Sequence, residues 1–248
     1  MPDTAKASQT IVDITIAAPI DAVWTALRDP ALIGQWFGWD APSLDEEIDF
    51  IFVKGSTPDE ANRLLQFGEW EGASDAIQLT QQAGGTRLQL LRSGGKIVDW
   101  AGTYDDIAEG WVNFFQQLRL ALEQHPGATR RTLYLSGSAN PGIGEPSAEL
   151  GLGEAAAMAP GAAYAVRLPT DDSISGQVWY RTHFQAGLTV EQWGNGLMVV
   201  TDMGVSPKRP HGGGSVLLTT YGLSDADFAA LETRWKAWWS ARYSAPAS

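Results

Sequence analysis

Cysteine is absent from the 248-residue sequence. Without thiols the chain has no disulfide framework, no thiolate nucleophile and no thiolate-bound zinc or iron–sulfur centre. The absence favours a reducing compartment, and the polar segment 1–10 lacks the cationic start and apolar run of a secretory signal. No apolar stretch reaches the roughly 18 residues that a membrane-spanning helix needs. We therefore expect a soluble, cytoplasmic protein.

Basic side chains are also scarce, because 17 Lys and Arg stand against 29 Asp and Glu, which gives a formal net charge of −12. A field of this sign repels the phosphate backbone of nucleic acids and the anionic head groups of membranes. We expect neither nucleic acid nor a membrane surface as a partner.

Motifs of catalysis and cofactor binding are missing as well. The three histidines, His125, His183 and His211, are too far apart in the sequence for two of them to bind one metal ion from a single helix. The segment 94–96 lacks the upstream glycine of a phosphate-binding loop, and no GxSxG elbow is present. The sequence therefore predicts no metal, no cofactor and no catalytic set, although whether the protein is an enzyme stays open.

Aromatic residues, by contrast, are plentiful: they make up 10% of the chain and include 11 Trp. The hydrophobic period is two in some segments and near 3.6 in others, which predicts both strands and helices. Helices are predicted at 20–27, 31–37 and 107–124, and strands at 12–16, 48–53, 64–71, 76–82 and 86–91, with a hairpin turn at 83–85.

The second half of the chain repeats the end of the first. Thr103-Tyr104 and Thr220-Tyr221 lie 117 residues apart, and the apolar stripe after each pair coincides at that offset. Segment 76–91 also aligns with 186–201 at an offset of 110. We predict two degenerate tandem units, 1–128 and 129–248, the second closed by a helix over 225–242. A chance similarity between two amphipathic helices is the alternative.

Three segments together resemble a known family: IVDITIAAPIDAVWTALRDPALIGQWF (11–37), GTRLQLLRSG (85–94) and EGWVNFFQQLRLALE (109–123). They are similar to the START-like or SRPBCC superfamily, and within it to the activator-of-heat-shock-protein-ATPase type. The resemblance implies an α+β helix-grip fold, in which an antiparallel sheet wraps a long C-terminal helix over a cavity. It also implies several functions, among which the fold does not choose.

The leading hypothesis is non-catalytic binding or sequestration of a hydrophobic small molecule, polycyclic aromatic or of polyketide type. Self-resistance to an enediyne antibiotic, a role of some members of the superfamily, is a narrower version of it. The alternatives are a polyketide cyclase or aromatase, which needs a titratable group inside its cavity, and a co-chaperone of a heat-shock ATPase. The oligomeric state is not predicted.

Aromatic residues of the second half are the predicted ligand wall, because the preceding segment 141–161 is rich in small residues and would leave space beside them. The first unit is predicted to have a filled interior. The alternative for the whole aromatic set is ordinary core packing. The predicted ligand-binding residues are Trp179, Tyr180, His183, Trp193, Trp235, Trp238, Trp239 and, from the first unit, Trp111.

Overall fold

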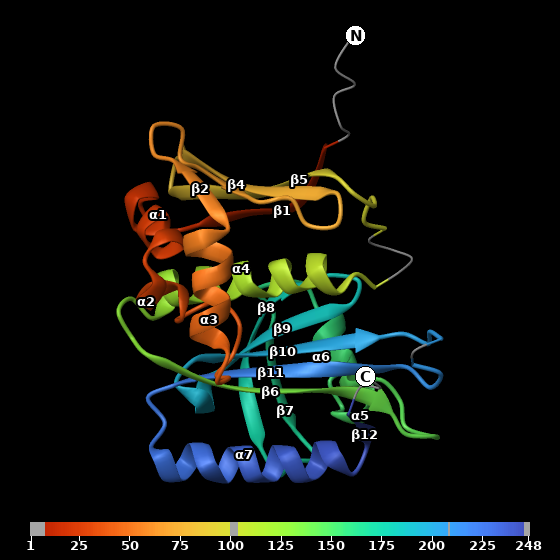
Figure 1. The fold of residues 1–248 in the computed structure, drawn as a ribbon. Coiled ribbons are helices and arrows are strands. Elements are labelled where there is room, and N and C mark those ends of the chain that lie inside the picture. Colours follow the sequence, from red (N-terminus) through yellow and green to blue (C-terminus); the bar gives the residue numbers. More distant parts are fainter. Residues whose placement is uncertain (1–7, 100–103, 208, 246–248) are drawn as a thin grey trace. The chain divides into compact units, whose positions relative to one another are not determined.

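The computed structural model describes residues 8–99, 104–207 and 209–245 (Figure 1). The chain forms two compact units, 1–127 and 128–248. Each unit contains an antiparallel sheet and one long helix at its C-terminal end, which confirms the α+β helix-grip class. In the described part of the chain, no helix is both long and apolar enough to span a bilayer.

The first unit has a five-stranded sheet in the order β1-β5-β4-β3-β2, with helix α4 along one face (Figure 1). The first and last strands are neighbours, because β1 pairs antiparallel with β5. Its elements are β1 (Ser8–Ile16), α1 (Ile20–Arg28), α2 (Pro30–Ile33), α3 (Leu44–Ile48), β2 (Ser56–Asp59), β3 (Leu64–Phe67), β4 (Ala73–Gln82), β5 (Gly85–Gly94) and α4 (Asp106–Gln124).

The strand predicted at 48–53 is wrong, because this segment ends α3 and continues as a π-helix over Asp49–Lys54. Ile48 and Phe52 are buried, whereas Phe50 and Val53 are 63% and 51% exposed. Burial at i and i+4 is the pattern of a helix. A short continuous apolar run does not distinguish a helix from a strand by periodicity alone, which explains the error.

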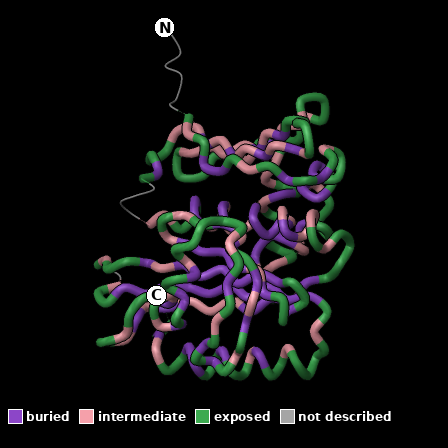
Figure 2. Tube along the Cα trace, turned by 180° about the vertical axis from the view of Figure 1, so that it is seen from behind, coloured by how far each residue is buried: buried purple, intermediate pink, exposed green. Residues whose placement is uncertain are grey.

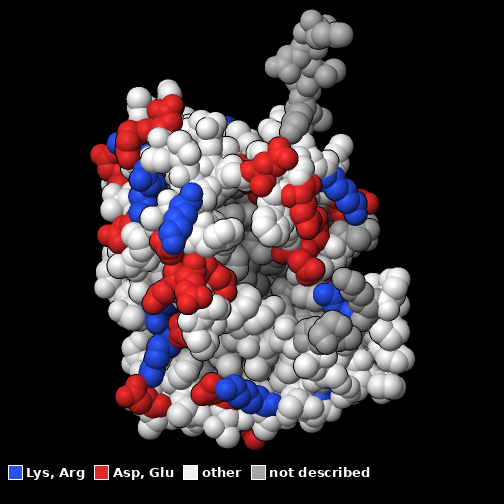
Figure 3. Space-filling view, viewed as in Figure 1, with Lys and Arg blue, Asp and Glu red and all other residues white. Residues whose placement is uncertain are grey.

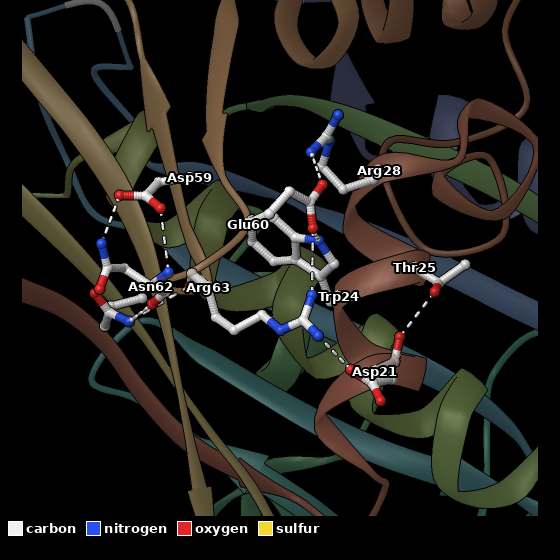
Figure 4. A network of polar contacts seen from close by, with 9 residues as sticks. Asp21, Trp24, Thr25, Arg28, Asp59, Glu60, Asn62 and Arg63 are labelled. Carbon is white, nitrogen blue, oxygen red and sulfur yellow. Dashed lines mark hydrogen bonds and ion pairs between the residues drawn. The ribbon is translucent and has the colours of Figure 1, made fainter.

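A polar network holds the β2–β3 turn against α1 (Figure 4). Glu60 accepts hydrogen bonds from Trp24 Nε1 at 2.6 Å, from Arg28 Nη1 at 3.1 Å and from Arg63 Nη1 at 3.3 Å. The two guanidinium groups each lie 5.6 Å from the centroid of the Trp24 ring, within the range of cation–π attraction. Asp21 accepts a further hydrogen bond from Arg63. The network thus fixes the outer end of the β2–β3 hairpin.

The second unit has a seven-stranded sheet in the order β12-β6-β11-β10-β9-β8-β7, and α7 lies along one of its faces (Figure 1). The segment rich in small residues forms two short helices. The elements are β6 (Arg130–Ala139), α5 (Pro146–Glu149), α6 (Gly153–Ala157), β7 (Ala163–Arg167), β8 (Ser173–Arg181), β9 (Gln185–Val190), a 3₁₀ turn (Glu191–Trp193), β10 (Gly196–Met203), β11 (Gly213–Tyr221), α7 (Asp225–Ser240) and β12 (Tyr243–Ser244).

The two sheets share a strand order, since β6 pairs with β11 in the second unit as β1 pairs with β5 in the first. The next strand of the sheet after this pair is β4 in the first unit and β10 in the second, so the β4–β5 hairpin corresponds to β10–β11. The alignment of 76–91 with 186–201 is therefore wrong, because it places this hairpin on β9–β10. Both segments have glycine in the turn between two strands, which produced the false match.

Two tryptophans of the first unit differ in packing and provide a test of where its stability lies. Trp36 is fully buried, stacks on Phe115 at 5.7 Å between ring centroids and donates Nε1–H to the Ala26 carbonyl oxygen at 2.9 Å. Trp70 is 63% exposed.

We expect Trp36→Ala to lower the free energy of unfolding by about 3–5 kcal/mol, because a large cavity is left in the core. Trp70→Ala, the matched control, should change it by less than about 0.5 kcal/mol. Urea denaturation followed by circular dichroism measures both values. Equal losses would show that Trp36 does not anchor this core.

Candidate ligand cavity

A cavity of about 580 Å³ opens in the first unit. Its walls come from the π-helix, the ends of β3, β4 and β5, and the start of α4. The apolar lining consists of Phe50, Ile51, Phe67, Trp70, Ala73, Ile107 and Trp111. The charged lining consists of Glu69, Glu71, Asp75, Arg92, Lys96 and Asp105. A filled first unit was predicted, so the structure differs from that expectation.

The alternation of side chains along β4 and β5 places one ion pair in the wall of this cavity. On β5, burial falls on alternate residues, and Arg92 continues the buried row that includes Leu88 and Leu90. On β4, Asp75 has the same parity as the buried Ile77. The β4–β5 register places Asp75 directly opposite Arg92. Both charged side chains therefore point to the helix-facing side of the sheet, where the apolar row ends.

The Asp75–Arg92 pair is bidentate and nearly enclosed. Arg92 Nε and Nη2 each donate to one Asp75 carboxylate oxygen at 2.8 Å, and the side chains are only 9% and 13% exposed. The hydrogen bonds that Arg92 donates to Asp75 raise the pKa of Arg92, burial opposes this, and the charges of Asp75 and Asp105 add to the rise. Among the described residues, Nη1 has no hydrogen-bond partner. Because Arg92 lines the cavity, this nitrogen is a candidate donor to a ligand oxygen.

Trp111 supplies the aromatic wall on the helix side. It lies in the second turn of α4, whose N-terminus is capped by the Asp105 carboxylate, which accepts from Ala108 N–H at 2.8 Å. Asp105 is thus the N-cap residue, and Asp106 is the first residue of the helix. The Trp111 ring stacks on Phe115 with 5.2 Å between centroids and lies 5.6 Å from Phe67. One face of the site is thus continuous with the aromatic core.

Trp70 stands at the mouth on a tight turn. Its N–H donates to the Ala73 carbonyl oxygen at 2.8 Å, and the reverse hydrogen bond measures 3.0 Å. Glu71 and Gly72 between them have φ of 51° and 81°, the positive values that a type I′ turn requires. The exposed indole is therefore held on a short, defined turn. In Figure 3 the surface is hollowed at the level of α4, and acidic side chains gather beside the hollow.

The structure brings together four of the predicted ligand-binding residues of the second unit, but within its core. Trp193, Trp235, Trp238 and Trp239 are all buried, and successive ring centroids in this series lie 6.0 to 6.4 Å apart. Trp235 Nε1 donates to Asp172 at 3.0 Å. They belong to the apolar cluster between the second sheet and α7, and Figure 2 shows buried segments running through this sheet.

The other predicted residues of the second unit lie apart from this cluster. Trp179 is half-buried, and His183 is exposed and contacts the edge of Phe184. Tyr180 is buried, donates its hydroxyl to Gln185 Oε1 at 2.6 Å and packs against Gly187. A ligand role for the eight predicted residues stays a prediction, and Trp111 is the one that lines the first-unit cavity.

Sequence reasoning missed Asp75 and Arg92, although a signal for them was present. The hairpin turn was predicted at 83–85, and extending its two strands by alternation pairs position 75 with position 92. Two opposite charges facing each other on an otherwise apolar strand face mark a buried ion pair. Metal binding gains no support, because no group of three or more His, Cys, Asp or Glu suited to a metal ion occurs in the described ranges.

No family model matches the sequence, and no curated protein matches it. Similar solved structures include DynU16, a protein of the dynemicin biosynthetic locus, at 19% identity over 97% of this chain and 96% of that chain, with a TM-score of 0.33. Aha1 from Colwellia psychrerythraea is 19% identical over 49% of this chain and 99% of its own, with a TM-score of 0.35.

The di-domain ARO/CYC protein BexL from the BE-7585A biosynthetic pathway is 12% identical over 93% of this chain and 92% of that chain, with a TM-score of 0.30. Similar structures thus include the Aha1 type that the sequence resembles.

The buried ion pair provides a prediction with a matched control. We expect Asp75→Asn to lower the free energy of unfolding by about 2–4 kcal/mol, because Arg92 loses its counter-charge in an enclosed position. Arg87 and Asp13 form a bidentate pair of the same types on β5 and β1, but they are 39% and 41% exposed. Asp13→Asn should therefore cost less than about 1 kcal/mol. Chemical denaturation measures the free energy of unfolding of both variants. Similar losses in the two would contradict the conclusion that the Asp75–Arg92 pair is enclosed.

Proposed function

We propose that the first unit binds a hydrophobic small molecule, with a polycyclic aromatic or polyketide-type body, in the cavity beside α4. The observation that carries this proposal is an aromatic-walled cavity of about 580 Å³ with one buried ion pair in its wall. Cavities of roughly 300–1,000 Å³, mostly apolar and with few polar groups, are typical ligand sites. Self-resistance through sequestration of such a molecule is the narrower version of the proposal.

Aromatic and polar groups have separate tasks in this proposal. Trp111 and Phe67 present flat faces to a ring system, which suits offset stacking. Arg92 Nη1 donates to a carbonyl or phenol oxygen of the ligand, and Asp75 holds the guanidinium in place. Trp70 covers the ligand from the mouth. The arrangement therefore favours a flat apolar body, and a hydrogen-bond acceptor at one edge of that body adds to the binding.

A cyclase or aromatase is the second candidate, because the titratable groups that it needs are present. Asp75, Arg92 and Asp105 line the cavity, where a confined poly-ketone chain would meet both a carboxylate and a guanidinium. Incubation with a linear poly-ketone analogue, followed by mass spectrometry and ultraviolet spectroscopy, separates the two candidates. Unchanged substrate favours binding alone. A cyclised product that disappears in Asp75→Asn, measured on folded protein, favours the enzyme.

The location of the site is tested with acridine, a neutral three-ring probe at about pH 8. We expect micromolar binding by isothermal titration calorimetry, together with quenching of Trp fluorescence. Trp111→Leu should weaken it about tenfold, because one stacked aromatic face is lost. Trp235→Leu, an equivalent change in the core of the second unit, should alter the affinity less than twofold at equal folded fraction.

The sequence-based prediction gives the opposite order, in which Trp235→Ala and Trp179→Ala weaken binding more than Trp111→Ala does. That result would move the site to the second unit. Native mass spectrometry of protein purified from its own host would then identify any retained molecule, independently of the probe.

A further inference from the structure

The charges that line the first-unit cavity do not balance. Four carboxylates (Glu69, Glu71, Asp75 and Asp105) stand against two cations (Arg92 and Lys96), which leaves a net charge of −2. We infer that the ligand of this cavity is a hydrophobic cation, an aromatic body that bears an amine. This inference rests on the proposed function and specifies the class of molecule bound.

The cationic charge inside the cavity is already compensated. Asp75 forms two hydrogen bonds of 2.8 Å with Arg92, and Asp105 contributes a second negative charge that acts on the same guanidinium. An anionic ligand at Arg92 would therefore meet two carboxylates as well as one cation. Arg92 remains a hydrogen-bond donor for a neutral oxygen, but it offers little net attraction to an anion.

At the mouth, negative charge remains. Glu71 is exposed and has no ion-pair partner among the described residues, and Asp105 at the start of α4 also lines the cavity. Lys96 is the one cation of the rim among the lining residues. An amine at the mouth gains attraction from the carboxylates, and the net charge of the whole chain, −12, raises the local concentration of cations.

The aromatic lining favours the same ligand. Trp70 is next to Glu71 on the turn, and its exposed indole offers a face to a cation beside the carboxylate. Trp111 and Phe67 offer further faces inside the cavity. Attraction of a cation to an aromatic face contributes most with tryptophan. A neutral ligand gains from the apolar walls, from ring stacking and from the Arg92 donor, whereas a cationic one gains in addition from cation–π attraction and from the carboxylates.

Three probes of the same ring size test the inference by calorimetry at about pH 8: 9-aminoacridine as the cation, acridine as the neutral molecule and anthracene-9-carboxylate as the anion. We expect the cation to bind about tenfold more tightly than acridine, and the anion to bind most weakly. Raising the salt to about 1 M should reduce the advantage of the cation, because the screening length falls to roughly 3 Å.

Two charge-removing variants localise the effect. Glu71→Gln should weaken binding of 9-aminoacridine about threefold and leave acridine unchanged. Glu154→Gln makes the same change in net charge at an exposed position in the second unit, outside the cavity lining, and should leave both affinities unchanged.

Equal binding of cation and neutral probe, or equal losses in the two variants, would overturn the inference while leaving the proposed function intact. Failure of all three probes to bind would contradict the proposed function itself, and the inference with it.

Discussion

The register between β4 and β5 is the constraint on which the first unit depends. It sets Leu79 opposite Leu88 and Ile77 opposite Leu90, and the next pair on the same face is Asp75 with Arg92. A shift of one residue would turn the apolar row to the other face and move the ion pair away from the cavity. Core, salt bridge and cavity wall are thus three consequences of one strand pairing.

The two units use tryptophan differently. In the second unit, four indoles contact one another between sheet and helix, and the neighbouring Tyr243 stacks on Trp239 at 4.3 Å. In the first unit, Trp36 fills the core and Trp111 lies at the border between core and cavity. Composition reveals the abundance of indoles, but the walls against which they lie depend on contacts far apart in the sequence. This is why ligand wall and core could not be separated by sequence reasoning.

Local patterns predicted the elements better than the site. The closing helices were expected at 107–124 and 225–242, and the structure has them at Asp106–Gln124 and Asp225–Ser240. The apolar run 48–53 was misassigned as a strand. Its five apolar side chains and one charge fit the period of a strand as well as that of a helix, and only tertiary contacts select Ile48 and Phe52 for burial. The cavity depends on how the π-helix, a tight turn and a helix start converge, which no single segment encodes.

Tyr180 and Gly187 face each other across β8 and β9, and the tyrosine ring occupies the space where a side chain at 187 would begin. A β-carbon built on Gly187 would lie 2.2 Å from a ring atom, so any larger residue there must displace the ring, whose hydroxyl donates a hydrogen bond to Gln185. Among homologous sequences, these positions should therefore change together. Tyrosine at 180 should occur only where 187 is glycine, and a smaller residue at 180 should release that restriction.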